Sequence, residues 1–70
     1  MFEYKTLKDD MLTINPKMIV AIRTRDDKSC YVHTVDSPDP FVVIETYEKV
    51  RDDFNKFMYT IQTIVNVKEG

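Results

Sequence analysis

The chain has 70 residues, and we expect them to form a single domain, residues 1–70. A chain this short can form only a small hydrophobic core. Apolar residues make up 43% and charged residues 31% of the sequence, a balance typical of folded proteins rather than of disordered ones. The net charge of -2 argues against nonspecific binding to nucleic acid, because proteins that neutralise phosphate backbones are usually basic.

Five short strands are predicted in the first 45 residues, where Asp, Asn, Ser and Pro mark the turns between apolar segments. These strands cover residues 2–7, 11–14, 18–25, 30–35 and 41–44. The first two would form a hairpin over residues 8–10, and the next two would pair across residues 26–29. The fifth is wholly apolar, which is typical of a buried strand.

From residue 46 onwards apolar residues recur at spacings of three and four, which predicts one long helix over residues 46–66. Thr46 is suited to cap its N-terminus, and Glu48 is suited to its first turn. The apolar face consists of Tyr47, Val50, Phe54, Phe57, Met58, Ile61, Ile64 and Val65. A second interpretation ends the helix near Tyr59 and makes residues 60–67 a strand, because six of these eight residues are β-branched.

These elements predict an α+β fold, in which a small, mainly antiparallel sheet carries one long C-terminal helix packed on one face. Pairing Ile22 with Val32 would place Val20 and Cys30 on the same, helix-facing side of the sheet. The other side would carry a mixed set that is not plainly polar: Ile19, Ala21, Arg23, Tyr31, His33 and Val35.

Both the mixed sheet face and the helix point to association with another molecule. A helix of about 21 residues spans roughly 31 Å, whereas strands of about five to eight residues span roughly 17–27 Å. Ile61, Ile64 and Val65 would therefore extend beyond the sheet. Small domains often bury such surfaces by association, and we expect a homodimer or a complex with another protein. The alternative is a monomer whose N-terminal strands cover the excess apolar surface.

The sequence offers no arrangement suited to catalysis, to a metal or to a cofactor. Cys30 and His33 would point to opposite faces of a strand, and the further Cys or His residues that a zinc site needs are lacking. Gly70 is the only glycine, which excludes a Gly-rich phosphate loop or a dinucleotide-binding motif. We therefore expect a protein that is not an enzyme and that needs no cofactor.

The expected location is cytoplasmic. Cys30 is the single cysteine, so no intrachain disulfide can form. Residues 1–10 carry charges throughout, unlike a signal peptide. The longest apolar run, residues 18–22, is far shorter than the about 20 residues of a membrane span, so we expect no membrane partner.

Four residues form a candidate recognition surface on the sheet. Arg23 and Arg25 would project from the third strand, beside Tyr31 and His33 on the fourth. Arginine and aromatic side chains of this kind contact proteins, and they also stack on the bases of nucleic acids. The expected function is a small non-enzymatic interaction or regulatory module that acts by surface recognition. The alternative is a regulator that binds nucleic acid through this basic and aromatic face.

The segment INPKMIVAI (14–22) leads into a predicted strand, and the segment FVVIETYEKV (41–50) leads into the predicted helix. A charged turn and a further strand lie between the two segments. This layout resembles the FlbD-type flagellar and swarming-motility proteins and related short bacterial β-β-β-α proteins, over about residues 11–57. The resemblance implies the topology and a bacterial or phage origin, and it brings no functional residue. The Asp-Gly or Asn-Gly turns of those proteins are lacking, and residues 37–40 (SPDP) stand in the place of one.

Overall fold

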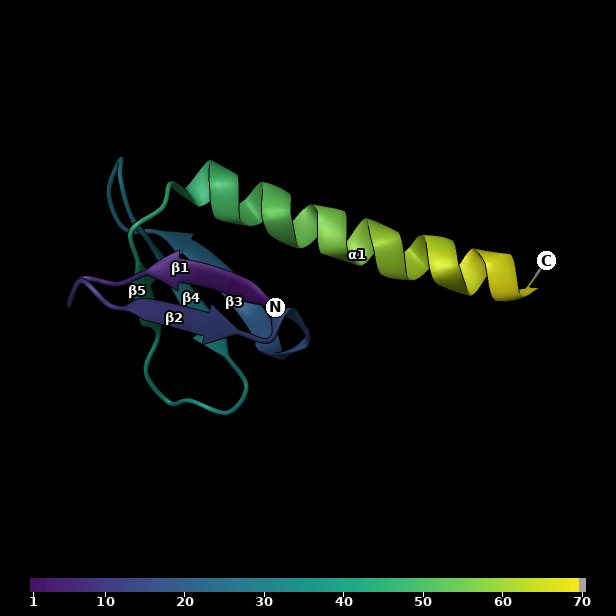
Figure 1. Cartoon of the computed structure of the whole chain (residues 1–70), viewed down its shortest axis with the longest axis horizontal. Coiled ribbons are helices and arrows are strands. Elements are labelled where there is room, and N and C mark those ends of the chain that lie inside the picture. The colour runs from purple at the N-terminus through teal and green to yellow at the C-terminus, as the bar shows by residue number, and fades with distance from the viewer. Residues whose placement is uncertain (70) are drawn as a thin grey trace.

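The computed structural model describes the backbone of residues 1–69 and the side chains of residues 1–61. Within this part the elements are β1 (Phe2–Lys5), β2 (Met11–Ile14), the 3-10 helix η1 (Pro16–Met18), β3 (Ile19–Thr24), β4 (Cys30–Thr34), β5 (Phe41–Val43) and α1 (Tyr47–Glu69). The predicted α+β fold is confirmed, with the strands divided between two small antiparallel sheets and one C-terminal helix (Figure 1).

The two sheets are joined at one end. β1 pairs with β2, and β3, β4 and β5 form the second sheet in that order. Beyond the end of β1, Thr6 forms a β-bridge with Val43, and the Ile44 N–H donates to the Lys5 carbonyl oxygen at 2.7 Å. The backbone therefore runs sideways from β2 through β1, β5 and β4 to β3, and it curves around one core.

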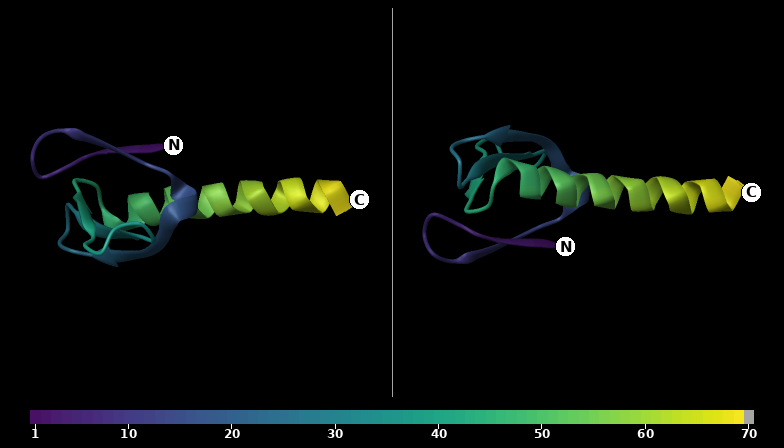
Figure 2. Two further views of the ribbon diagram at one scale, coloured as in Figure 1. Left: turned by 90° about the horizontal axis from the view of Figure 1, so that it is seen from below. Right: turned by 90° about the horizontal axis from the view of Figure 1, so that it is seen from above.

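The core lies between the two sheets and the first half of α1. Its buried apolar residues come from all three parts: Tyr4, Ile14, Ile19, Cys30, Val32, Val43 and Val50. Figure 2 shows the β1–β2 hairpin and the three-stranded sheet on opposite sides of the start of α1. The helix therefore closes the side of the core that the two sheets leave open.

The β1–β2 hairpin turns without glycine. The Asp9 N–H donates to the Thr6 carbonyl at 3.1 Å, and the Thr6 N–H donates to the Asp10 carbonyl at 2.9 Å. This is the pattern of a three-residue loop with a bulge, whose last residue takes the left-handed conformation. Asp9 takes that conformation, with φ at 65°. Aspartate tolerates positive φ better than most residues do, so it replaces the glycine that such a turn favours.

Replacing Asp9 with valine is expected to lower the free energy of unfolding by about 1–2 kcal/mol, because β-branched residues are strongly disfavoured at positive φ. Asp9→Gly is the matched control and should leave the stability equal or slightly higher. Both variants lose the exposed ion pair between Lys5 and Asp9, so that pair does not affect the comparison. The measurement is urea denaturation, and equal stability of the two variants would contradict the assigned turn.

The predicted register of β3 against β4 is confirmed at Ile22, which pairs with Val32. Ile19 and Val20 were predicted on the wrong faces of the sheet. Ile19 pairs with Thr34 and Ala21 pairs with His33, so Val20 is an extra residue that forms a bulge between these two pairs. Strict alternation breaks there. Ile19 is consequently buried in the core, whereas the side chain of Val20 is 62% exposed.

α1 begins where the sequence predicts it. The Lys49 N–H donates to the Thr46 hydroxyl oxygen at 3.2 Å, so Thr46 caps the helix, and Glu48 lies in the first turn. The helix then continues to Glu69 without interruption. Residues 60–67 are therefore helical, and the alternative of a C-terminal strand is wrong. Figure 1 shows that the second half of α1 runs past both sheets, as the length comparison predicts.

Candidate interaction surfaces

The first half of α1 is fastened to the sheets by apolar side chains. Val50 has no exposed surface, and Phe54 packs against the buried core. The ring of Phe57 meets the ring of Phe2 edge to face, with their centroids 6.2 Å apart. The helix continues beyond this contact, away from the body of the protein (Figure 2).

The C-terminal segment of α1, residues 58–69, extends away from that body. Met58 and Tyr59 are 39% and 71% exposed. Ile61 is partly buried. Ile64 and Val65, the other two predicted contact residues on this helix, lie in the C-terminal segment, but their side chains are outside the described residues. The structure thus places all three predicted helix positions on the part of α1 that passes beyond the sheets.

The sequence of this segment is unusual for an isolated helix. Residues 57–67 contain no charged residue, in a chain that is 31% charged. Residues 60–67 are mostly β-branched, and such residues have only modest helix propensity. In proteins most helix stability comes from packing of an apolar face rather than from propensity. A helix of this composition is stabilised mainly by apolar contacts, and the backbone of this segment runs past both sheets (Figure 1).

The outer face of the three-stranded sheet gathers three of the four predicted recognition residues. Arg23 lies directly opposite Tyr31, and His33 lies opposite Ala21. Arg23 is exposed, whereas Tyr31 and His33 are half-buried. Within the described residues, the His33 Nε2 atom is buried and has no hydrogen-bond partner.

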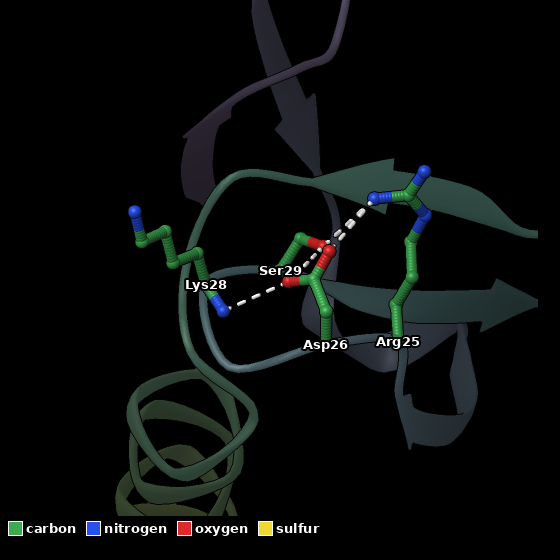
Figure 3. Close-up of polar contacts among 4 residues, drawn as sticks. All are labelled: Arg25, Asp26, Lys28 and Ser29. Atoms are coloured by element: carbon green, nitrogen blue, oxygen red, sulfur yellow. Dashed lines mark hydrogen bonds and ion pairs between the residues drawn. The ribbon is translucent and has the colours of Figure 1, made fainter.

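The structure places Arg25 apart from this face, in the turn between β3 and β4 (Figure 3). Its Nη1 donates to the Asp26 carboxylate and to the Ser29 hydroxyl oxygen, each at 3.1 Å. The Lys28 N–H and the Ser29 hydroxyl both donate to Asp26 at 2.8 Å. These bonds, led by the one from Lys28, hold the pKa of Asp26 below its usual value. The charge of Arg25 is therefore matched by Asp26, which weakens the basic character predicted for the sheet face.

Cys30 and His33 lie on opposite sides of β4, so they form no pair. Cys30 has no exposed surface and belongs to the core. Burial, together with the nearby negative charge of Glu45, raises the pKa of the Cys30 thiol to about 11. The thiol is thus protonated at neutral pH and is not a nucleophile. In the part of the chain that the structure describes, no three His, Cys, Asp or Glu residues are grouped to hold a metal ion.

A polar cluster that the sequence did not reveal links β1 to α1. The Tyr4 hydroxyl donates to the Asp53 carboxylate at 2.7 Å, and the Lys49 Nζ approaches both carboxylate oxygens at 2.9 Å. Burial and the bond to Asp53 raise the pKa of Tyr4 well above its usual value. Burial alone would raise the pKa of Asp53, but the bonds from Tyr4 and Lys49 outweigh it and lower that pKa. The contact spans 49 residues of sequence, so no local spacing could indicate it.

Stability is expected to fall when the pH is lowered from 6 to 3. The pKa of Asp53 is lower in the folded chain than the ordinary value of 3.8, so the unfolded chain takes up protons first as the pH falls. The stabilisation that ionised Asp53 provides is present above pH 3.8 and is lost as the pH falls below it. Asp53→Asn should show a smaller loss between these pH values than Asp52→Asn, in denaturation curves recorded at both. Equal losses would contradict the role assigned to Asp53.

Two adjoining hollows lie along β2, which the sequence also did not reveal. One has a volume of about 400 Å³ and the other of about 310 Å³, and both are lined by Leu12 and Phe41. The first extends towards the β1–β2 turn at Lys8, and the second towards Asp36 in the loop that precedes β5. We refer to the two hollows together as the β2 groove.

No helix in the described residues has both the length and the apolar character needed to cross a membrane. The chain matches no protein-family model, no curated protein and no solved structure. The resemblance to the FlbD-type proteins therefore stays a prediction.

Proposed function

We propose that this chain is a small non-enzymatic interaction module that acts as a homodimer, with the C-terminal segment of α1 as the dimer interface. The observation that carries the proposal is the continuation of α1 past both sheets. A regulatory role in a bacterial or phage cytoplasm belongs to the same proposal, and it rests on the sequence and on the resemblance described above.

The apolar pattern of α1 supports this interface because it does not stop where the sheets stop. Spacings of three and four alternate without a break, as in the seam of a coiled coil. The seam consists of Tyr47, Val50, Phe54, Phe57, Ile61 and Ile64. The side chains at the first four of these positions pack against the two sheets. The same spacing continues into the C-terminal segment of α1, which runs past both sheets.

A second copy of the chain suits this segment better than a charged partner does. Because residues 57–67 carry no charge, two such helices can lie side by side without repulsion between like charges. Burial of the β-branched side chains against a copy would compensate for their modest helix propensity. The second copy thus supplies both the apolar cover and the helix stability that the segment lacks.

The test is the solution mass over a concentration series, measured together with far-ultraviolet circular dichroism. We expect twice the chain mass of 8.3 kDa at high micromolar concentration. Helix content should fall on dilution, because the C-terminal segment would unwind when the dimer dissociates. A compact monomer with unchanged helix content at every concentration would overturn the proposal.

A further inference from the structure

Within the described residues, no strand other than β1 pairs with β2, so the backbone groups on the outer edge of β2 are free. The Thr6 N–H bonds to the Asp10 carbonyl, so this pair is a hydrogen-bonded pair of the hairpin. Bonded and non-bonded pairs alternate along antiparallel strands. Leu12 and Ile14 therefore bond to β1, whereas the N–H and C=O groups of Met11 and Thr13 point away from it.

The residue opposite Met11 supports this assignment. Lys5 is the partner of Met11 in the β1–β2 register. The Lys5 carbonyl accepts from the Ile44 N–H at 2.7 Å, on the side of β1 that faces away from β2. The pair is therefore not bonded across the hairpin, and the backbone of Met11 is directed outward. Among the described residues, no backbone hydrogen bond reaches the outer edge of β2.

The β2 groove lies beside this free edge. In Figure 1, β2 is at the outer side of its sheet and the loop between β4 and β5 lies below it. The groove is mainly apolar, and several of its side chains are exposed to water. Leu7 and Met11 are 57% and 59% exposed, and Met18 is 38% exposed. An unpaired strand edge next to exposed apolar side chains is the arrangement that binds an added strand.

Polar groups in the groove restrict the chemistry of such a strand. Thr34 lines the groove and is only 7% exposed, and its hydroxyl has no hydrogen-bond partner in the described part of the chain. Lys8 lies at one end of the groove and Asp36 at the other. Neither residue forms an ion pair with any other described residue. Asp10 also lines the Lys8 end, where its carboxylate accepts a hydrogen bond from the Thr6 hydroxyl. Lys8 is therefore the group at this end that can pair with an acidic side chain of the peptide, and Asp36 favours a basic side chain at the other end.

We propose that the β2 edge and groove bind an extended peptide segment of another protein, which adds to the β1–β2 sheet as a third antiparallel strand. In the antiparallel direction the N-terminal end of the peptide lies near Asp36 and its C-terminal end near Lys8. The peptide is thus basic at its first residue, acidic at its last, and apolar at alternate positions between them. This inference rests on the proposed function as an interaction module, and it names what that module recognises.

The test uses the acetylated and amidated peptide Lys-Thr-Ile-Thr-Ile-Thr-Glu, in which the charged and apolar side chains share one face. The full-length protein, labelled with nitrogen-15, is titrated with the peptide and followed by nuclear magnetic resonance. We expect shifts at Met11, Thr13 and Thr34. A peptide with N-methyl groups on the bonding amides should bind at least tenfold more weakly, because it cannot form the strand ladder. The peptide with Lys and Glu exchanged should also bind more weakly.

Thr13→Pro is the variant that removes the outward N–H. Proline is tolerated at an edge strand where the N–H faces away from the sheet, so the hairpin should persist. We expect binding at least tenfold weaker than in the wild type, whereas Thr13→Val, which keeps the N–H, should bind as the wild type does. If Thr13→Pro fails to fold, the N-methylated peptide makes the same comparison on the wild-type protein.

The inference would be overturned by no shifts up to millimolar peptide, by shifts confined to the outer sheet face around Arg23 and Tyr31, or by equal binding of the N-methylated peptide. A dimer that dissociates in Thr13→Pro would also overturn it, because the β2 edge would then pair with a second copy. Failure of the proposed dimer is a separate result. A wild-type monomer that still binds the peptide at β2 would support the inference and reject the helix interface.

Discussion

Replacing both Ile61 and Ile64 with glutamate is expected to convert the dimer into a monomer of 8.3 kDa. The two positions continue the apolar seam of α1 beyond the sheets, and each glutamate would place an unpaired charge in an apolar interface. We expect the dissociation constant of the dimer to rise by at least about 100-fold, which corresponds to roughly 2.7 kcal/mol. Sedimentation equilibrium measures the change directly.

The matched control adds the same two charges at other positions of the same helix. In Gln62→Glu with Asn66→Glu, the glutamates lie outside the apolar arc of the sequence, so this variant should remain dimeric. Near-ultraviolet circular dichroism checks that the sheets are intact in both variants. The helix interface is wrong if both pairs of substitutions dissociate the protein equally, or if neither pair does.

Val32→Ala is expected to lower the free energy of unfolding by about 2–3 kcal/mol. Val32 is fully buried at the centre of the three-stranded sheet, and its two lost methyl groups would leave a cavity in the core. A domain of this size has about 0.05–0.15 kcal/mol of stability per residue, so the loss is a large part of the total. Urea denaturation gives the value from the shift of the midpoint.

Val20→Ala provides the comparison within the same sheet. The bulge in β3 leaves Val20 62% exposed, so truncation there removes little buried surface. We expect a loss below about 1 kcal/mol, arising mainly from the lower strand propensity of alanine. A loss equal to that of Val32→Ala would mean that Val20 is buried on the core side of the sheet, as strict alternation along β3 predicts. It would therefore contradict the bulge.

The five strands and α1 were accessible from the sequence because local patterns specify them, whereas the 3-10 helix η1 was not predicted. The strand at 11–14 is bounded by turn residues, and the change of apolar spacing at residue 46 separates the last strand from the helix. The cap at Thr46 follows from the same local chemistry. What the sequence left open at 60–67 was a conflict between β-branched composition and helical spacing, and the unbroken spacing proved the better guide.

The errors arose where one residue or one distant contact decides the outcome. The bulge at Val20 adds a single residue and has no compositional sign. Arg25 falls beyond the end of β3, where the turn around Asp26 engages its guanidinium. The bond from Tyr4 to Asp53 and the β2 groove both depend on how distant segments pack. The candidate surface was therefore predictable for Arg23, Tyr31 and His33, which share one face of adjacent strands, and not for residues in turns.

The bridge between Thr6 and Val43 has a consequence for how the chain folds during synthesis. The β1–β2 hairpin emerges first, but its neighbouring strand in the finished protein is β5, which emerges after β3 and β4. A two-stranded hairpin is at best marginally stable in water on its own. The hairpin therefore gains its lasting order late, when β5 and the first turns of α1 have left the ribosome. The fold is therefore completed only after the second half of the chain has been translated.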